Sequence, residues 1–269
     1  MLELINKVKE INPLVLHYTN EVTINDCANI TLALGASPLM SYSNEEVEEV
    51  VSIASSVVIN IGTMNSNRLD LFLQAGKAAN KFNKPVILDP VGVFATKTRT
   101  DFTNKLLNKI KFDVVKGNVA EIKFIGGLDV RGQGVDSFDD GEDISEVIKK
   151  VAKKLGCIVV ATGKVDFISD GNIVIKIFNG TSKLKSVTGT GCMTGSLIGS
   201  YLGAYNSLEG RERDNFKKVE VVAMGVLTMA VSGELADKDN IAIGTFKEEL
   251  MNNVYEMNID KLKEYGRIE

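Results

Sequence analysis

One segment of the chain has the residue types and spacing to bind a phosphate group: residues 187–192, which read VTGTGC. Its two glycines let the backbone turn so that successive N–H groups converge on one point, and a helix that starts there adds partial positive charge. The segment therefore favours an anion hole for a phosphate or its transition state, although a tight turn before a helix would use the same residues. The third glycine of a dinucleotide fingerprint and the Lys-Ser/Thr pair of a Walker A loop are both missing.

Within this segment we predict that the backbone of Gly189, Thr190 and Gly191 is catalytic and that Cys192 acts beside it. Cys192 is expected in the first turn of the helix, where the pKa of a thiol is lowered below its free value of about 8.5. It would then serve as a nucleophile or a proton acceptor; a small cysteine packed under the loop is the alternative. If the backbone is the main catalytic device, Gly191→Val should damage turnover more than Cys192→Ala does.

Two other segments carry oxygen ligands of the kind that a hydrated Mg²⁺ ion prefers. Asn118 and Glu121 in the segment KGNVAE share a face if a helix begins there, and Asp89 ends an apolar run before Pro-Val-Gly. The carboxyl ends of parallel strands are where α/β sheets bind ligands. Structural roles stay open for each, because Asn118 and Glu121 also fit a capping box and an aspartate before proline favours a turn.

Residues 17–40 mix asparagine, threonine and glycine with apolar side chains and show no clean period. This composition fits the wall of an apolar pocket for a small neutral heterocycle, with the amides of Asn20, Asn25 and Asn29 as polar tips. A helix over residues 25–34 with irregular ends is the alternative, and periodicity alone does not decide between them.

An alternation of strands and helices must position these segments. Apolar, β-branched runs occur at 57–62, 85–92, 112–117 and 157–163, and helical spacing occurs at 69–82, 100–111 and 144–155. Such alternation predicts a doubly wound α/β fold: a mostly parallel central sheet with helices on both faces. Asp170-Gly171 separates two alternating runs at 165–169 and 172–178, which predicts an antiparallel edge hairpin with a type I′ turn.

The last third of the chain is predicted to be helical. Glycines recur every four residues through the helix expected over 192–205, which indicates that another backbone comes close to that face. A second helix, over 216–236, has the apolar positions of a core element. Because no repeat or linker interrupts the pattern, we predict a single domain over residues 1–269.

Composition narrows the class of protein. The formal net charge of −4 offers no basic excess for a nucleic-acid backbone, so an anionic ligand must be met by local groups. A single histidine and three cysteines without a CxxC motif argue against a zinc site and against a disulfide framework, and favour a reducing, cytoplasmic compartment. The sequence contains no run of about 18 apolar residues, so we expect no membrane-spanning helix.

Taken in order, several motifs resemble one family. They are HYTN, N..AN..LALGASP.M, DPVG, KGN..EI, GVDS at residues 134–137, ATG.VD, DG and VTGTGC. Together they look like hydroxyethylthiazole kinase, a family of the ribokinase-like superfamily, over about residues 11–250. VTGTGC stands where the superfamily usually has GxGD, so that Cys192 takes the place of the catalytic aspartate of related sugar kinases.

The resemblance implies ATP- and Mg²⁺-dependent phosphorylation of 4-methyl-5-(2-hydroxyethyl)thiazole, a salvage step in thiamine synthesis, by a homotrimer with pockets at its subunit interfaces. Its implied residue roles, with our additions of Asn25 and Asn118, are the following: Met40, Gly189 and Asn25 for the thiazole; Lys116, Thr162 and Asn118 for ATP; Asp89 and Glu121 for Mg²⁺, through water.

This sequence departs from the family at two points. Lys116 stands where an arginine is common, which keeps the charge but loses the planar fork that grips phosphate, and Phe94 is bulkier than usual. Alternatives within the fold are a kinase of a pyrimidine alcohol or a sugar, and an ATP-dependent NAD(P)H-hydrate dehydratase. A nucleotide-binding regulator without turnover is a further alternative.

Overall fold

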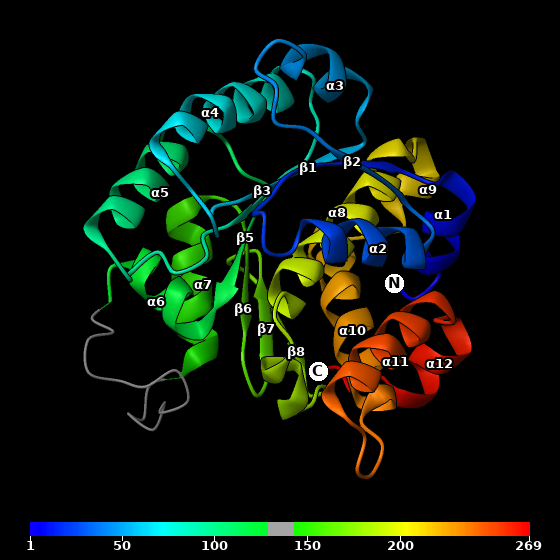
Figure 1. Ribbon diagram of the computed structural model, residues 1–269. Coiled ribbons are helices and arrows are strands. Elements are labelled where there is room, and N and C mark those ends of the chain that lie inside the picture. Colours follow the sequence, from blue (N-terminus) through cyan, green and yellow to red (C-terminus); the bar gives the residue numbers. More distant parts are fainter. Residues whose placement is uncertain (129–142) are drawn as a thin grey trace.

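The structure, a computed structural model, describes residues 1–128 and 143–269. The GVDS motif at residues 134–137 lies outside the described residues. Among the described residues an eight-stranded sheet runs in the order β2-β1-β3-β4-β5-β6-β7-β8 (Figure 1). The strands are β1 (Leu14–Tyr18), β2 (Ser37–Met40), β3 (Ser56–Asn60), β4 (Val86–Asp89), β5 (Val114–Asn118), β6 (Ile158–Thr162), β7 (Asp166–Ser169) and β8 (Val174–Ile177).

The strands from β2 to β6 pair in parallel, whereas β7 and β8 form an antiparallel hairpin at one edge. The mostly parallel, doubly wound fold with an edge hairpin is therefore confirmed. The β-branched runs fill this sheet because both of its faces are buried, as in β3, where all five residues are buried. Strand β1 was not predicted.

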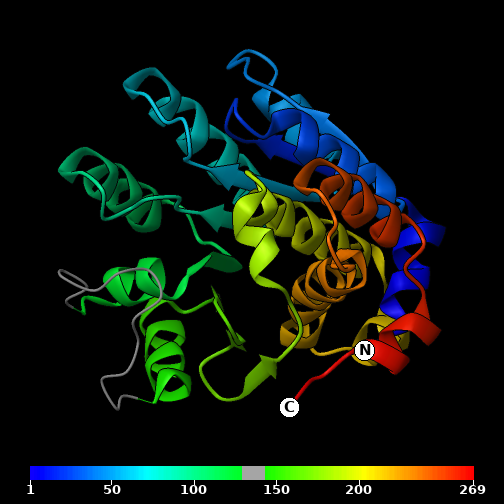
Figure 2. The ribbon, with the colours of Figure 1, turned by 60° about the horizontal axis from the view of Figure 1, so that its bottom comes forward.

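Helices cover both faces of the sheet (Figure 2). They are α1 (Leu4–Ile11), α2 (Ile24–Leu34), α3 (Val47–Ile53), α4 (Ser66–Lys81), α5 (Lys97–Lys109), α6 (Val119–Gly126), α7 (Ile144–Leu155), α8 (Thr190–Ser207), α9 (Gly210–Asp214), α10 (Lys218–Ala236), α11 (Ile243–Tyr255) and α12 (Ile259–Tyr265), with a 3-10 helix η1 (Ser182–Ser186) before α8. Helices α3–α7 pack on one face and α8, α10 and their neighbours on the other, which gives two hydrophobic cores around one sheet.

The glycines of helix α8 allow it to pack closely against the sheet. A Cβ added to Gly199 would lie 2.9 Å from the side chain of Val58 and 3.0 Å from that of Val15, so the glycine face packs against side chains of the sheet. The predicted approach of another backbone to this face is therefore wrong. Close backbone contact with α8 comes instead from α10, where a Cβ on Gly225 would lie 2.7 Å from the Cα of Ile198.

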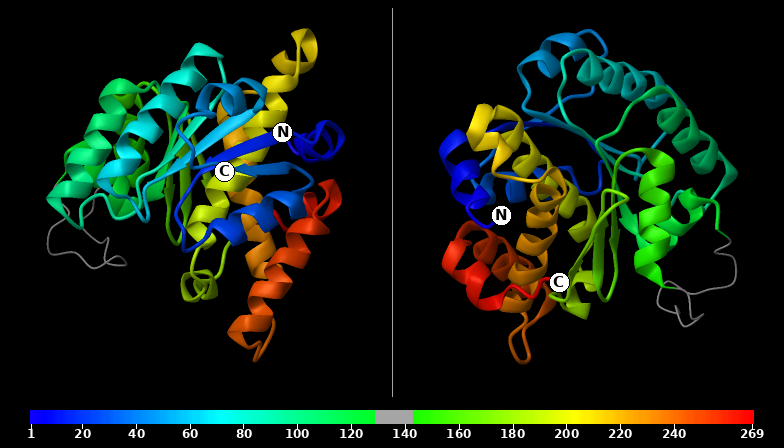
Figure 3. Two further views of the ribbon diagram at one scale, coloured as in Figure 1. Left: turned by 45° about the horizontal axis from the view of Figure 1, so that its top comes forward. Right: turned by 180° about the vertical axis from the view of Figure 1, so that it is seen from behind.

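Helix α10 is the core helix that the sequence predicted, and it lies beside α8 and the C-terminal helices (Figure 3). By length and composition it is the one described helix that could cross a membrane, but 83% of its apolar window is buried inside the protein. Burial on all sides accounts for its nearly uniform apolar surface.

The hairpin turn differs from the prediction. Strands β7 and β8 are joined by four residues, 170–173, and only Gly171 of the Asp170-Gly171 pair has a positive φ, at 93°. The side chain of Asp170 accepts hydrogen bonds from the backbone N–H groups of Asn172 and Ile173, at 2.8 and 3.0 Å. This side-chain turn replaces the predicted type I′ turn, because it holds the loop without a positive φ at the aspartate.

The strand order places a switch point between β1 and β3. The chain leaves β1 for β2 on one side and then crosses to β3 on the other, so the loops after β1 and β3 separate at their carboxyl ends. Open α/β sheets bind ligands in the crevice that such a separation creates.

Candidate active site

The segment from β5 into α6 forms the first wall of the site. Asn118 caps α6, and Glu121 completes a capping box, with both hydrogen bonds at 2.8 Å. The other carboxylate oxygen of Glu121 accepts the N–H of Gly92 at 2.8 Å, which ties α6 to the loop after β4. The capping role is confirmed; a metal role stays a prediction.

A buried ion pair stands at the centre. Lys116 on β5 lies 3.5 Å from Asp89 at the end of β4, and both side chains are almost fully buried. Burial raises the pKa of Asp89 to about 6, and nearby Glu121 also raises it, while Lys116 and Asn60 lower it. Burial lowers the pKa of Lys116, but the surrounding anionic groups outweigh it and raise that pKa above its ordinary value. The lysine is therefore the fixed positive charge of the site.

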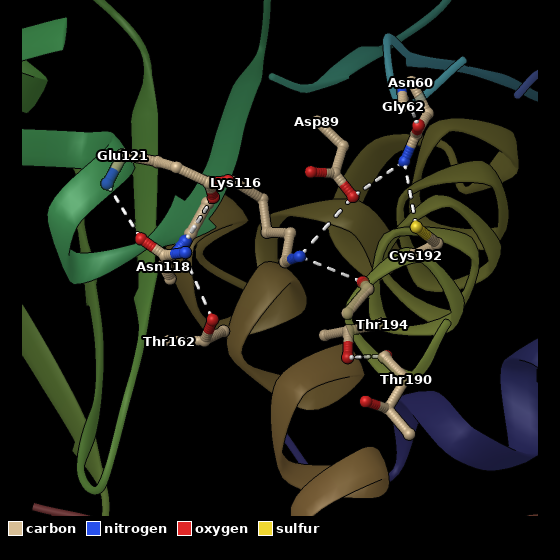
Figure 4. Close-up of polar contacts among 12 residues, drawn as sticks. Asn60, Gly62, Asp89, Lys116, Asn118, Glu121, Thr162, Thr190, Cys192 and Thr194 are labelled. Atoms are coloured by element: carbon tan, nitrogen blue, oxygen red, sulfur yellow. Dashed lines mark hydrogen bonds and ion pairs between the residues drawn. The ribbon is translucent and has the colours of Figure 1, made fainter. Parts of the chain in front are cut away.

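Lys116 also reaches the start of α8. Its ammonium donates to the backbone carbonyl of Gly191 at 2.9 Å. Figure 4 shows the lysine between two groups of side chains, with Asp89, Asn60 and Cys192 on one side and Asn118, Glu121 and Thr162 on the other. Three of the residues predicted for catalysis, ATP and metal, namely Cys192, Lys116 and Asp89, are thus brought together around one charge.

The predicted anion hole is formed by the first turn of α8. Gly189 precedes the helix with a φ of +96°, and the first intrahelical bond runs from the N–H of Met193 to the carbonyl of Gly189 at 2.8 Å. The N–H groups of Thr190, Gly191 and Cys192 therefore lie in the part of the helix that has no intrahelical acceptor. The Thr190 hydroxyl donates to Leu184 at 2.9 Å, so this residue serves the site through its backbone.

The environment of Cys192 corrects one expectation. Burial raises the pKa of Cys192 above its ordinary value, and Asp89 raises it further, although Lys116, Thr23 and Asn60 act against them. The predicted lowering by the helix start is wrong, because the cost of burying a thiolate exceeds that gain.

Two amides beside Cys192 complete the site. Nδ2 of Asn20 and Nδ2 of Asn60 lie 3.3 and 3.2 Å from the Cys192 sulfur. Asn20 was considered only as one of three pocket tips, and Asn60 was missed. The signal for Asn60 was the one polar residue inside the otherwise apolar run VVINIG, close to its carboxyl end, where a polar side chain can enter the ligand crevice.

Arg99 on α5 holds together the two loops that follow Asn60 at the end of β3 and Asp89 at the end of β4. Its guanidinium donates to the carbonyls of Ile61 and Gly62 after β3, at 3.1 and 2.7 Å, and to that of Val91 after β4, at 2.8 Å. This planar group with several donors matches three carbonyls at once. No local pattern in the sequence indicated this role.

Other predicted residues lie farther from this centre. Thr162, at the end of β6, donates to the carbonyl of Gly117 at 3.3 Å. Asn25 is exposed on α2 and accepts from the Asn29 amide at 2.9 Å. Met40 is half-buried at the end of the edge strand β2 and pairs in register with His17. Among the described residues, no hydrogen bond links the three to Cys192, so their ligand roles stay predictions.

Asp166, in the motif ATG.VD, gives the site a pH-dependent element. Its carboxylate accepts the N–H of Gly163 at 2.9 Å and shapes the turn after Thr162. Burial raises the pKa of Asp166 to about 7, while the Gly163 N–H and Lys116 act to lower it. Because the folded pKa lies above the unfolded value near 4, this carboxyl stabilises the fold at low pH, and its contribution is lost as the pH rises through 7.

We expect Asp166→Asn to be more stable than the parent protein at pH 8, with the difference disappearing toward pH 4. The amide keeps an oxygen for the Gly163 N–H but has no charge to bury, and the gain is about 1.4 kcal/mol for each pH unit between about 4 and 7. Melting temperatures of both proteins across this range measure it, with the exposed Asp101→Asn as control. A difference that stays constant with pH would contradict this origin.

Comparison with solved structures identifies the fold of the chain. The chain has the ribokinase-like fold, a mostly parallel sheet with an antiparallel edge hairpin and helices on both faces. A ribokinase-like superfamily protein from Enterococcus faecalis V583 shares the fold at a TM-score of 0.61 and 15% identity, covering 90% of this chain and 86% of that one.

The chain belongs to the hydroxyethylthiazole kinase family, whose model matches residues 5–260. It is 64% identical over 269 residues to the hydroxyethylthiazole kinase of Clostridioides difficile (strain 630), covering 100% of this chain and 99% of that protein. The structure of the hydroxyethylthiazole kinase from Pyrococcus horikoshii OT3 matches with a TM-score of 0.85 at 32% identity, covering 100% of this chain and 97% of that one. The family resemblance seen in the sequence is confirmed.

Proposed function

We propose that this chain transfers the γ-phosphoryl group of ATP to the hydroxyl of 4-methyl-5-(2-hydroxyethyl)thiazole, which yields the thiazole phosphate for thiamine synthesis. Family membership along nearly the whole chain supports the reaction. The observation that carries the proposal is the start of α8, where Gly189 turns the backbone, next to the buried Lys116. There the N–H groups at the helix start can bind the phosphoryl group during its transfer, beside a fixed positive charge.

Phosphoryl transfer depends mainly on the alignment of the two substrates and on stabilisation of the charge on the phosphoryl oxygens. As the hydroxyl oxygen bonds to the γ-phosphorus, the bond from phosphorus to the ADP oxygen breaks and the hydroxyl proton leaves. Bond making is weak at the barrier, so donors that stabilise the phosphoryl oxygens contribute more than a strong base does. The backbone of Gly189, Thr190 and Gly191 would supply those donors, and Cys192, once ionised to its thiolate, would receive the proton.

Mg²⁺ fits this site through water. The described residues contain no cluster of three or more His, Cys, Asp or Glu side chains that could hold a metal directly. Asp89 and Glu121 are the acidic groups at the centre, and both Glu121 oxygens already accept backbone N–H groups. Mg²⁺ commonly keeps its waters and binds through one or two carboxylates plus substrate phosphates. When bound, the ion would neutralise phosphate charge there.

The remaining site roles are proposed by position. Lys116, Asn118 and Thr162 line the ends of β5 and β6 and would face ATP, whereas Met40 and Asn25, with Gly189, would face the thiazole.

The assembly is proposed to be a homotrimer with its active sites at the subunit interfaces. Two apolar side chains at opposite ends of α2, the helix that carries Asn25, are largely exposed: Val22 just before its start, at 65%, and Leu32 near its end, at 56%. Exposed apolar side chains on this helix fit a subunit contact. A cytoplasmic location is supported by the three cysteines, which are all unpaired, and a single domain by the one sheet that both cores share.

A coupled ADP-release assay tests the proposed reaction. The substrates are the thiazole alcohol, a hydroxymethylpyrimidine, ribose and hydrated NADH, each with ATP and Mg²⁺. We expect the thiazole alcohol to give the highest kcat/KM by at least about tenfold and to form an organic phosphate. Higher turnover of the pyrimidine or sugar would favour another kinase, phosphate release with NADH repair would favour the dehydratase, and no ADP from any substrate would favour a regulator.

We expect Cys192→Asp to keep substantial activity. A carboxylate has an ordinary pKa near 3.9 and is ionised at pH 7, so it offers a proton acceptor at the same place without the cost of forming a thiolate. Steady-state kcat for the folded variant, with ATP binding checked by titration, measures this. Cys192→Ala is the matched comparison. Near-complete loss in a folded Cys192→Asp protein that binds ATP would contradict the acceptor role.

A further inference from the structure

Two buried asparagines meet at the Cys192 sulfur from the two sides of the switch point. Asn20 follows β1 and Asn60 ends β3, and their side chains are 3% and 2% exposed. Their Nδ2 atoms lie 3.3 and 3.2 Å from the sulfur, and Nδ2 of Asn20 also donates to Oδ1 of Asn60 at 3.0 Å. The two amides and the sulfur therefore form one contact group that joins three elements far apart in the sequence.

The orientation of both amides is fixed by backbone donors. Oδ1 of Asn20 accepts the N–H of Thr23 at 3.1 Å, and Oδ1 of Asn60 accepts the N–H of Gly62 at 2.8 Å. A backbone N–H can only donate, so each amide must turn its oxygen toward the backbone and its NH₂ toward the sulfur. A flipped amide would place two donors against each other and leave a buried N–H without an acceptor.

We propose that Asn20 and Asn60 are positioning residues that hold the Cys192 sulfur as a hydrogen-bond acceptor for the phosphoryl transfer. This inference rests on the proposed function. A thiolate has three lone pairs, and two amide N–H donors leave one of them to receive the proton of the substrate hydroxyl. The same two donors partly offset the cost of burying that charge, because hydrogen bonds to an ionised acceptor are stronger than those to a neutral one.

Asn20 gives the cleaner test of the two. The Asn60 amide also donates to Asp89 at 3.0 Å, so a change there would disturb the carboxylate as well. Asn20→Asp keeps the shape and the oxygen that accepts the Thr23 N–H, and replaces the NH₂ that faces the sulfur by a second oxygen. The substitution thus reverses the polarity at two contacts, the Cys192 sulfur and Oδ1 of Asn60, while the size of the side chain is kept.

We expect Asn20→Asp to lower kcat by about tenfold to a hundredfold, in line with the loss of one hydrogen bond to a charged acceptor, with the KM for ATP changed less than about twofold. We also expect the iodoacetamide alkylation of Cys192 at pH 7.5 to slow by about tenfold, because the thiolate is the reacting form. Mass spectrometry of the peptide that carries Cys192 follows this thiol separately from Cys27 and Cys157.

The control is Asn104→Asp, the same change on an exposed position of α5, which should leave both readouts unchanged. If Asn20→Asp does not fold, Asn20→Ser removes the amide without adding charge and should show the same two effects at smaller size. Alkylation at the parent rate in either folded variant would overturn the proposal, as would a fall in kcat without slower alkylation. Because alkylation needs no substrate, it tests this contact even if the proposed reaction fails.

Discussion

Gly189→Ala is expected to lower kcat by about a hundredfold or more, because it moves the backbone that forms the anion hole. Gly189 has a φ of +96°, which costs an L side chain about 1–3 kcal/mol. A Cβ there would also lie 2.7 Å from the Cγ2 atom of Thr23 on the loop before α2, so α2 or the start of α8 must shift. A displacement of even a fraction of an ångström changes how the N–H groups face a phosphoryl oxygen.

The measurement is steady-state kcat and KM with the melting temperature of each protein. Gly156→Ala is a matched control, because Gly156 also has a left-handed φ, of 65°, but a Cβ there meets nothing within 4 Å and it lies at the far end of β6. It should lose stability with little change in kcat. Equal kcat in the two folded variants would show that the backbone at Gly189 is not a catalytic device.

Gly191→Val, the substitution that the sequence suggested, acts through a different contact. A Cβ on Gly191 would lie 3.2 Å from the Lys116 ammonium, the flexible end of a side chain, and Gly191 has an ordinary helical φ. The structure therefore makes Gly189 the more demanding position of the two. The expected ranking of Gly191→Val against Cys192→Ala stays a prediction.

Lys116→Met is expected to lower kcat by about a hundredfold to a thousandfold and to destabilise the fold at pH 8 by about 3–5 kcal/mol. Methionine keeps the unbranched, apolar part of the side chain but removes the ammonium that lies 3.5 Å from Asp89 and 2.9 Å from the Gly191 carbonyl. The Asp89 carboxylate would then be buried without its partner. Loss of that charge removes an influence that lowers the pKa of Asp89, which would rise further.

Chemical denaturation at pH 8 and pH 5 measures the loss of stability, which should be smaller at pH 5, where Asp89 is protonated at little cost. Lys81→Met is the control: Lys81 forms an exposed ion pair with Glu48 at 2.9 Å. Exposed pairs of this kind contribute little, so its stability and kcat should hardly change. If Lys116→Met and Lys81→Met behave alike, the buried pair has no special role.

Local patterns in the sequence were sufficient for most elements. Helix α7 has the predicted bounds, residues 144–155, because its apolar face and Gly156 at its end are local signals. The capping box of Asn118 and Glu121 is likewise a matter of spacing. Strand β1 was missed because its five residues include His17 and Tyr18, and only pairing with β2 and β3 shows that these side chains are buried in a sheet.

The features of the site likewise fall into those that local sequence indicates and those that only the fold brings together. Order and spacing of the motifs determined the family, the fold and the loop of Gly189–Cys192, since a turn at glycine and a helix start are properties of neighbouring residues. Tertiary structure alone decided that Asn20 and Asn60 meet the Cys192 sulfur, and that burial raises the pKa of that thiol. Desolvation and contacts between distant loops depend on how the strands are ordered in the sheet, which no local stretch of sequence encodes.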